Sequence, residues 1–534
     1  MHFQRFIVLA NFFLYICSCG QPLSKDRARF LAYDAKGQPG QSPVGRSPEN
    51  LSSEESQLEV SIDSPDNVVN VPPPPPPPSC AELKVKYFKS EPDTCETAEA
   101  LCLGQPLEVA QIFSDQMVVQ RGDKTIVWGK GYPGEFVTLN LGTAEACGIT
   151  DDTGRWEAKF QHLSAGGPHI LYIEGDKGRD IIEKNDVLIG DIWVSSGQSN
   201  MYWPLNSSSG GAQVANSADL DQIRFYNVAP QQSAIPLGAF ANTVDDSWSI
   251  VNGDYRNELL KFSAVSFFFG RKVHLETGVP IGLINAAVGG TKIEPWTPEK
   301  EENSAQSFLY NGMINPLIPM NIKGFLWYQG ESNHAQGLKY QPLFEKLINN
   351  WRSRFKNENL PFYYVQLAAF SQLNFAGVKL AQSNVNKTLK NTGMVVISDV
   401  STLGNIHPPD KKSVGARLAL WALAKDYGQK EILYSGPTPK TLSINNNRAI
   451  LTFDHVGEGL SSRDNMPLNF FEVSASKNGP YYPASNVVIS GDRLIITANQ
   501  VAQPSSIRFG WPTSAIPNLV NSGGLPTSMF VISN

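Results

Sequence analysis

The residues best suited to chemistry in this sequence are a serine and a histidine that each follow a strand-like run. Ser199 stands in the segment Gly197-Gln198-Ser199-Asn200-Met201, directly after the apolar run 186–196. A serine hydroxyl becomes a nucleophile when a nearby base removes its proton, and histidine is the usual base because its pKa lies near neutrality. Position 201 is Met, so the segment departs from the Gly-x-Ser-x-Gly elbow, which ends in Gly.

Seven histidines are available as a base, and two of them lie in loops of the region that carries Ser199. His2 lies at the N-terminus, His274 lies in a predicted helix, and three others lie in predicted β regions. His407 lies between a predicted strand and a predicted helix, and the prolines at 408 and 409 fix the loop and the helix start. We therefore predict that His407 is the base, in preference to His334.

Acyl transfer to a serine also needs hydrogen-bond donors for the oxyanion that develops on the substrate. Gly289 and Gly290 follow a predicted strand that ends near Ala287, and a glycine exposes its N–H to a ligand. Gln329 follows another predicted strand and offers a side-chain amide. Together with Ser199 and His407, these segments lie at the carboxyl ends of predicted parallel strands, where an open α/β sheet binds its ligands.

The elements that would position these residues alternate between strand and helix. We predict strands at 186–196, 279–287, 322–328, 362–368 and 394–399, and helices at 257–277, 340–355, 378–389 and 410–427. This alternation is typical of βαβ units and a parallel sheet. The segment 206–252 is rich in Ser, Asn, Gly and Asp, and we predict a long loop over the site.

The regions on both sides of this α/β region read as β structure. Residues 136–141 and 169–174 alternate with period two between turn signals, which predicts a small β-sandwich with Trp128 and Trp156 in its core. Residues 431–534 return to strand-like runs. The predicted organisation is a signal at 1–19, a linker at 20–79, a β-sandwich at 80–185, an α/β catalytic domain at 186–430 and a C-terminal β module at 431–534.

The N-terminal region predicts export. Residues 6–16 form an apolar core of the length of a signal sequence, too short to span a membrane. The run ends at Cys17-Ser18-Cys19, which predicts a lipoprotein with Cys19 lipidated, with plain cleavage as the alternative. The following linker, with seven prolines at 72–78, predicts an extended tether. The localisation that follows is periplasmic or cell-surface, with a membrane partner through the lipid anchor.

Charge and cysteine usage restrict the class of partner. The formal net charge is −6, which gives no basic field for nucleic acid. Four cysteines, Cys80, Cys95, Cys102 and Cys147, remain after the signal, and an even number in an exported chain predicts two disulfides whose pairing stays open. Their spacing does not fit a zinc site, and we predict neither a metal nor a cofactor.

Four ordered segments resemble the motif blocks of sialate O-acetylesterase-like carbohydrate esterases of the SGNH hydrolase superfamily. They are 190–201, 284–291, 324–333 and 406–408. The resemblance implies a three-layer αβα domain with a parallel sheet and removal of O-acetyl groups from sugars through an acetyl-enzyme. It also implies Ser199 as nucleophile, His407 as base, and an oxyanion hole from the Ser199 N–H, Gly289 or Gly290 and Gln329, with Asn333 as the alternative to Gln329.

One position departs from that family. Its members usually carry an acidic residue two or three positions before the histidine, and this chain has Gly404 and Asn405 there. Asn405 or Asp399 could orient the imidazole instead, whereas Asp410 is predicted to cap the next helix. The missing acid keeps open an alternative, a tethered carbohydrate-binding protein with weakened catalysis.

Aromatic and polar residues near the motif blocks complete the predicted site. Trp203 and Trp296 lie in predicted loops, where an indole face could stack on a sugar ring, and core packing is the equal alternative. Glu331 and Asn333 are predicted to support the loop after the strand 322–328. The substrate is predicted to be an acetylated carbohydrate, and the sequence leaves open the glycan and the oligomeric state.

Overall fold

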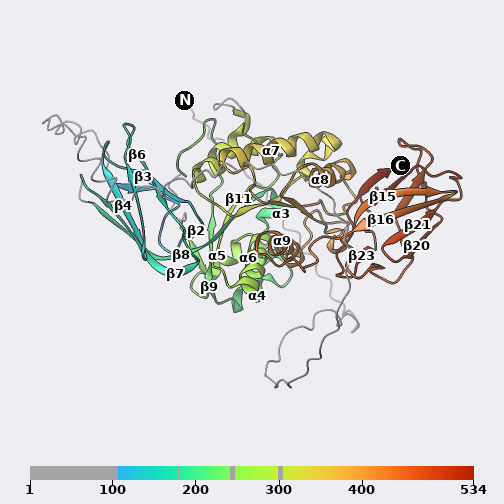
Figure 1. Cartoon of the computed structure of the whole chain (residues 1–534), viewed down its shortest axis with the longest axis horizontal. Coiled ribbons are helices and arrows are strands. Elements are labelled where there is room, and N and C mark those ends of the chain that lie inside the picture. The colour runs from blue at the N-terminus through green and yellow to red at the C-terminus, as the bar shows by residue number, and fades with distance from the viewer. Residues whose placement is uncertain (1–105, 178–179, 241–246, 299–304) are drawn as a thin grey trace, which may run out of the picture. The chain divides into compact units, whose positions relative to one another are not determined.

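The computed structural model describes residues 106–177, 180–240, 247–298 and 305–534 (Figure 1). The predicted signal, Cys19, the linker and three of the four cysteines predicted to form disulfides lie outside these ranges. Cys147 lies half-buried on a strand and is a free thiol among the described residues. The disulfides and the lipid anchor therefore stay predictions. Within the described ranges, no helix is both long enough and apolar enough to cross a membrane.

The first strands of the described chain form two antiparallel sets that face one buried interior. One set has the order β1-β3-β6, and the other joins β5, β4 and β7. Their bounds are β1 Glu108–Val109, β3 Thr125–Lys130, β4 Phe136–Leu141, β5 Ala144–Ile149, β6 Arg155–Phe160 and β7 Gly166–Gly175. Burial alternates along β6, and Trp128 and Trp156 are 4% and 1% exposed. Both indoles are core residues, as the sequence predicted.

A single long strand, β8 (Ile181–Gly197), carries the chain from these strands into the central sheet. Its first half pairs antiparallel with β7, and its second half lies between two parallel neighbours, β11 and β12. The burial follows this change, because residues 181–186 are exposed or half-buried and residues 187–197 are all buried. The predicted boundary between residues 185 and 186 thus falls inside one continuous strand.

The central sheet is an α/β sheet in the order β10-β9-β11-β8-β12-β13-β14. All neighbouring pairs from β9 to β14 are parallel, and β10 pairs antiparallel with β9 at the edge. The bounds are β2 Val118–Gln120, which pairs with β8, β9 Leu220–Asn227, β10 Ser249–Val251, β11 Ile281–Ala287, β12 Gly324–Tyr328, β13 Phe362–Val365 and β14 Thr392–Val395. β8, β11, β12 and β13 match four of the predicted strands, and β14 overlaps the fifth, predicted at 394–399, by two residues.

Helices lie on both sides of this sheet, with α7 and α8 on one side and α6 and α9 on the other (Figure 1). Their bounds are α3 Ser199–Tyr202, α4 Gly211–Ser217, α5 Arg256–Lys261, α6 Ala264–Thr277, α7 Tyr340–Arg354, α8 Ala376–Thr388 and α9 Lys411–Asp426. The predicted helix 257–277 is two helices, because the chain leaves helical geometry at Phe262 and Ser263 caps the second through Ser266 N. The helix at 410–427 is confirmed, with Asp410 as its N-cap.

The prediction of a long loop at 206–252 is wrong. The segment contains α4 and two sheet strands, and β9 pairs with β11 inside the central sheet. Its sequence conceals the strand because Arg224 is polar yet only 3% exposed. The guanidinium is satisfied by two hydrogen bonds to the Asp186 carboxylate, at 2.7 and 3.0 Å. This long-range pair makes a charged residue compatible with a buried strand.

The last part of the chain is all β and has a hydrophobic core of its own. It forms sheets β15-β16-β21-β20 and β19-β18-β22-β24 and the pair β17-β23. The bounds are β15 Thr438–Asn445, β16 Arg448–Asp454, β17 Leu460–Ser462, β18 Phe471–Ser474, β19 Tyr482–Pro483, β20 Asn486–Ser490, β21 Arg493–Thr497, β22 Ser506–Phe509, β23 Leu519–Asn521 and β24 Phe530–Ser533.

Candidate active site

A close backbone approach places Ser199 at the start of α3. Gly197 ends β8 with φ of 136°, and a Cβ there would lie 2.2 Å from the Tyr328 carbonyl oxygen. Gln198 N donates to the same carbonyl, and Val288 N donates to the carbonyl of Gly197. Only glycine fits this turn, which fixes the chain between the ends of β11 and β12. Ser199 therefore emerges at the carboxyl edge of the parallel sheet.

His407 reaches Ser199 from a loop 208 residues further along the chain, and its Nε2 lies 2.8 Å from the serine Oγ. The loop is fixed on both sides of the imidazole. Asn200 Nδ2 donates to the Ile406 carbonyl oxygen at 3.0 Å, and Ser209 N donates to the carbonyl of Pro409. In this geometry a neutral imidazole can accept the serine proton directly.

The environment of His407 favours its neutral form. Partial burial lowers the pKa of the imidazole, and the charge of nearby Lys411 lowers it further. Trp203 stacks on the ring with centroids 4.7 Å apart and planes 22° from parallel. A neutral, fixed imidazole is the state that a general base needs before reaction.

Asp399 and Asn405, the two residues predicted to orient His407, do not contact its ring. Arg417 donates to both oxygens of Asp399, at 2.7 and 2.6 Å, so this carboxylate belongs to a structural ion pair. Asn405 Oδ1 accepts from the backbone N–H of His407 at 2.9 Å and shapes the loop. Within the described residues, the polar side-chain contact of the imidazole is Ser199, and no carboxylate hydrogen-bonds to it.

The side-chain amide of Gln329, predicted from the sequence to belong to the oxyanion hole, is hydrogen-bonded to other groups. The side chain is fully buried, and its Nε2 donates to the Thr291 carbonyl at 3.1 Å and to Asn333 Oδ1 at 2.6 Å. The alternative, Asn333, uses its Nδ2 to donate to Glu294 at 3.0 Å and to Gln336 at 2.6 Å. Both amides are therefore occupied in bracing the loop after β12, and neither presents a free donor to Ser199.

The glycine loop after β11 does lie beside Ser199. A Cβ built on Gly289 would stand 3.6 Å from the Ser199 Cβ. Gly289 and Gly290 are exposed, and Gly290 has φ of 73°, in the left-handed region. The N–H of Ser199 is one of the unpaired donors at the N-terminus of α3. Backbone N–H groups of Ser199 and Gly289 thus remain as donors beside the hydroxyl.

The two predicted sugar-stacking tryptophans have different environments. Trp296 is fully buried, donates to Thr291 Oγ1 at 3.0 Å and packs edge-on against Trp327, so it is a core residue. Trp203 is half-buried and covers His407 with one face. Tyr202, which the sequence interpretation did not single out, is 49% exposed on α3 next to Ser199.

A buried polar network lies beside the Ser199–His407 pair, and the sequence interpretation missed most of it. Asn200 Nδ2 donates to Glu331 Oε1 at 2.6 Å, and Asn200 Oδ1 accepts from Lys411 Nζ. All three side chains are buried, and Glu331 was predicted only as a loop support. Lys411 begins α9, where the positive end of the helix dipole disfavours an ammonium group, and that mismatch was a usable sequence signal.

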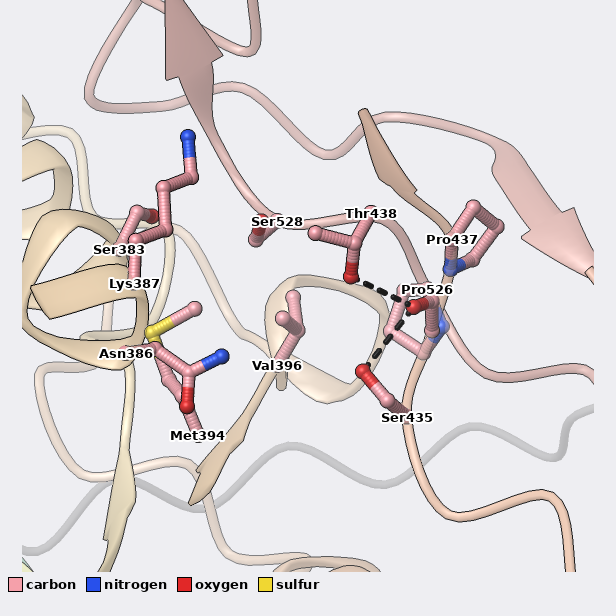
Figure 2. A pocket seen from close by; sticks show the side chains of 11 residues that line it. Ser383, Asn386, Lys387, Met394, Val396, Ser435, Pro437, Thr438, Pro526 and Ser528 are labelled. Carbon is pink, nitrogen blue, oxygen red and sulfur yellow. Dashed lines mark hydrogen bonds between the residues drawn. The ribbon is translucent and has the colours of Figure 1, made fainter. Parts of the chain in front are cut away.

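Two spaces of the described structure are lined by residues other than Ser199 and His407. Figure 2 shows a cavity of about 20 Å³, room for one water, where the hydroxyls of Ser435 and Thr438 both donate to the Gly436 carbonyl. A larger groove of about 1070 Å³ adjoins it and shares the lining residues Asn386, Lys387 and Thr438. Neither Ser199 nor His407 lines these two spaces. Among the described residues, no group of three His, Cys, Asp or Glu side chains could hold a metal ion.

The central sheet, with a serine and a histidine at its carboxyl edge, defines an α/β hydrolytic enzyme, and comparisons identify its family. Residues 189–423 match the model of the carbohydrate esterase family described as sialic acid-specific acetylesterase. A carbohydrate acetylesterase from Xanthomonas citri superposes with a TM-score of 0.74 at 34% identity, over 80% of this chain and 99% of that one. The chain therefore belongs to this family of carbohydrate acetylesterases.

Curated relatives agree with this assignment. The sialate O-acetylesterases of Homo sapiens and Pongo abelii are each 28% identical over 483 residues, covering 79% of this chain and 92% of theirs. The likeness thus extends beyond the segment matched by the family model. The protein is a carboxylic ester hydrolase of the carbohydrate O-acetylesterase type. Membership of this family indicates that it removes O-acetyl groups from sugars.

Proposed function

We propose that the protein removes O-acetyl groups from sugars by a serine mechanism with an acetyl-enzyme intermediate. Ser199 Oγ attacks the acetyl carbonyl carbon while His407 Nε2 takes its proton. The imidazolium then protonates the sugar oxygen as the ester C–O bond breaks. Water, deprotonated by the same nitrogen, attacks the acetyl-serine, and the imidazolium returns the proton to Ser199 Oγ as the acyl C–O bond breaks and acetate leaves. The observation that carries this proposal is the 2.8 Å contact between His407 Nε2 and Ser199 Oγ.

The proposed oxyanion hole consists of backbone donors. Its donors are the N–H groups of Ser199 and Gly289, and the Gly289 position supports this because a Cβ built there would lie 3.6 Å from the Ser199 Cβ. Donors that are held rigidly stabilise the tetrahedral intermediate without reorganising during the reaction. Gln329 and Asn333 contribute to the oxyanion hole indirectly. Their side chains hydrogen-bond to the backbone of Thr291 and Ile293 and so hold the glycine loop in place.

Two finer features of the predicted enzyme belong to the same proposal. The sheet order and the helices on its two sides support a three-layer SGNH-type domain flanked by β modules. The substrate class is an acetylated sugar, such as an O-acetylated sialic acid or an acetylated oligosaccharide. Tyr202 and Trp203 are suited to border the sugar, because they are exposed and half-buried, respectively, and lie on or beside the helix of Ser199.

The test compares the wild type with Ser199→Ala on 4-nitrophenyl acetate and a panel of acetylated glycans. Acetate release that disappears in Ser199→Ala, with the variant still folded by circular dichroism, supports the serine mechanism. The intact-mass spectrum after rapid acid quenching should then show one acetyl adduct, on the peptide of Ser199. Turnover by Ser199→Ala at the wild-type rate would exclude Ser199 as nucleophile. Ser207→Ala, a nearby exposed serine, is the matched control.

We also propose that the enzyme is exported and anchored through a lipid on Cys19. Support comes from the apolar run 6–16, which ends at Cys17-Ser18-Cys19, and from the proline-rich linker. Expressed in a bacterial host with labelled palmitate, the wild type should carry the label and sediment with membranes, whereas Cys19→Ala should do neither. Unchanged labelling in Cys19→Ala would contradict the anchor.

A further inference from the structure

The buried network of Glu331, Asn200 and Lys411 has no role in the mechanism above, although it lies directly against the reacting pair. Lys411 is fully buried at the start of α9, four residues after His407. Glu331 is 5% exposed at the start of the 3-10 helix after β12, and its Oε2 has no hydrogen-bond partner. Burying two ionised groups costs desolvation free energy unless each group stabilises the charge of the other.

Asn200 connects the two groups in one orientation. Its amide N–H donates to the Glu331 carboxylate at 2.6 Å, and its amide oxygen accepts from the Lys411 amino group. The same Nδ2 donates to the carbonyl of Ile406, the residue before His407. This arrangement fits an ionised carboxylate on Glu331 and an ammonium group on Lys411. Asn200 also follows Ser199 in the chain and is hydrogen-bonded to the residue before His407, so the network is connected to the backbone at both reacting residues.

The surroundings of Lys411 also favour a cation. Its Nζ lies 5.3 Å from the ring centroid of Tyr328 and 5.7 Å from that of Trp203, the indole that stacks on His407. Burial nevertheless lowers the pKa of Lys411 to about 7, and the negative charges of Glu331 and Asp410 oppose that fall. Burial raises the pKa of Glu331, and Asn200 and Lys411 oppose that rise.

The charged and titratable groups around the network come from four elements. Lys411 and Asp410 belong to α9 and its cap, Tyr328 to β12 and Glu331 to the helix after it, and Asn200 and Ser199 to α3. Asp410 is engaged with Ser413, through the backbone N–H and the hydroxyl. His334 Nδ1 lies 3.0 Å from the backbone carbonyl oxygen of Glu331. Lys411 is the one charged group of this set that acts on His407.

We propose that Lys411, held charged by Glu331 through Asn200, is a positioning residue that keeps His407 neutral and able to accept the Ser199 proton. Among the described residues, no carboxylate contacts the imidazole. The charged group that affects the proton affinity of His407 is therefore the ammonium group of Lys411. The proposal rests on the role of His407 as the base. Its consequence is activity that persists to lower pH than an unperturbed imidazole would allow.

The direction of the pH effect follows from the charge. A base must be unprotonated, so kcat/KM falls as pH decreases through the pKa of His407. Burial and then Lys411 lower that pKa from its ordinary value of 6.5. Removing the Lys411 charge with Lys411→Met therefore raises the His407 pKa, and the acid limb of kcat/KM should move to higher pH by about one pH unit. Lys412→Met removes the same charge from an exposed neighbour and should leave the limb in place.

Glu331→Gln tests whether the network acts as a unit. Gln keeps the size of the side chain and an acceptor for Asn200, but leaves Lys411 without its counter-charge, so Lys411 becomes neutral and the acid limb moves the same way. In the Lys411→Met background, Glu331→Gln should produce no further shift. Glu331→Gln, which nearly preserves the shape of the site, carries the test if Lys411→Met does not fold.

Histidine NMR titration separates this proposal from the serine mechanism. In full-length Ser199→Ala protein, with the His407 signal assigned by comparison with His407→Asn, Lys411→Met should raise the imidazole pKa by the same amount as the kinetic limb. An unshifted or lowered His407 pKa in Lys411→Met, with lower activity at every pH, would overturn the proposal and make the network purely structural. Failure of the serine mechanism would appear instead as turnover by Ser199→Ala.

Discussion

At the scale of single residues, the site depends on which side chains still have unused hydrogen-bonding groups. Ser199 and His407 have the contact that their chemistry needs, at 2.8 Å. Gln329 carries a suitable donor, but its amide donates to Thr291 and Asn333. Asp399 carries a suitable carboxylate, but that carboxylate accepts from Arg417. A polar residue near a site stabilises the reacting atoms directly only if its donor or acceptor faces them.

Asp399→Asn tests this distinction. Arg417 and Asp399 are 14% and 10% exposed, so the substitution should lower the free energy of unfolding by about 2 kcal/mol, since it leaves a cation without its partner. The pH profile of kcat/KM should not move, because the carboxylate does not contact His407. Glu472→Gln, in the comparable pair with Arg508 of the C-terminal module, is the control and should give a similar loss. A fall in kcat of roughly 10⁴-fold with unchanged stability would instead identify Asp399 as a triad acid.

At the scale of elements, the site depends on tight turns at the carboxyl ends of three adjacent strands. β8 is followed by Ser199, β11 by Gly289 and β12 by Glu331, and β8 lies between the other two strands. The sheet therefore brings these segments together before any side-chain contact is made. The turn at Gly197 is the most restrictive of them, because its φ is positive and the Tyr328 backbone is in the way.

Gly197→Ala should show how restrictive that turn is. The added methyl would lie 2.2 Å from the Tyr328 carbonyl oxygen, so β8 and β12 would have to separate. We expect a loss of more than about 2 kcal/mol in the free energy of unfolding, and little remaining esterase activity. Urea denaturation and initial rates check both quantities. Gly404→Ala, which would contact nothing within 4 Å, should change neither, and wild-type behaviour of Gly197→Ala would contradict the argument.

At the scale of the whole described chain, the N-terminal strands and the α/β region share one hydrophobic core. That core runs from Leu107 through the central sheet to Ala422, whereas the C-terminal β module has a separate core. β2 pairs with β8, and Trp248 Nε1 donates to the Ile112 carbonyl at 2.8 Å across the two regions. The sequence boundary near residue 185 therefore does not correspond to a gap in packing.

A truncation series tests that continuity. A fragment of residues 186–534 lacks β1 to β7 and the first five residues of β8, so it exposes apolar surface of the shared core. We expect it to be insoluble or to lack a cooperative thermal transition, because the lost contacts are not replaced. A fragment of residues 106–534 keeps them and should fold and hydrolyse 4-nitrophenyl acetate. A soluble, active fragment of residues 186–534 would show that the two regions are energetically independent.

Residue types and their periodicity were enough to predict the parts of this protein that depend on local sequence. Alternating strand and helix patterns predicted the five parallel strands that carry the site, and the order of motifs predicted the serine and histidine that meet there. Prediction failed at Leu220–Asn227, where the buried Arg224 hides a strand, because burial of a charge depends on a distant partner, Asp186. Local patterns contain no information about such partners.

Which polar groups remain available for chemistry depends on the folded contacts and not on local sequence. Asp399, Asn405 and Gln329 had suitable functional groups and positions along the chain, yet each is committed to another contact. Lys411 lay at an unfavourable helix position and is buried against Asn200 beside His407. The physical reason is that hydrogen bonds saturate: a donor or acceptor used by one partner is lost to another, and folding determines which partner comes within reach.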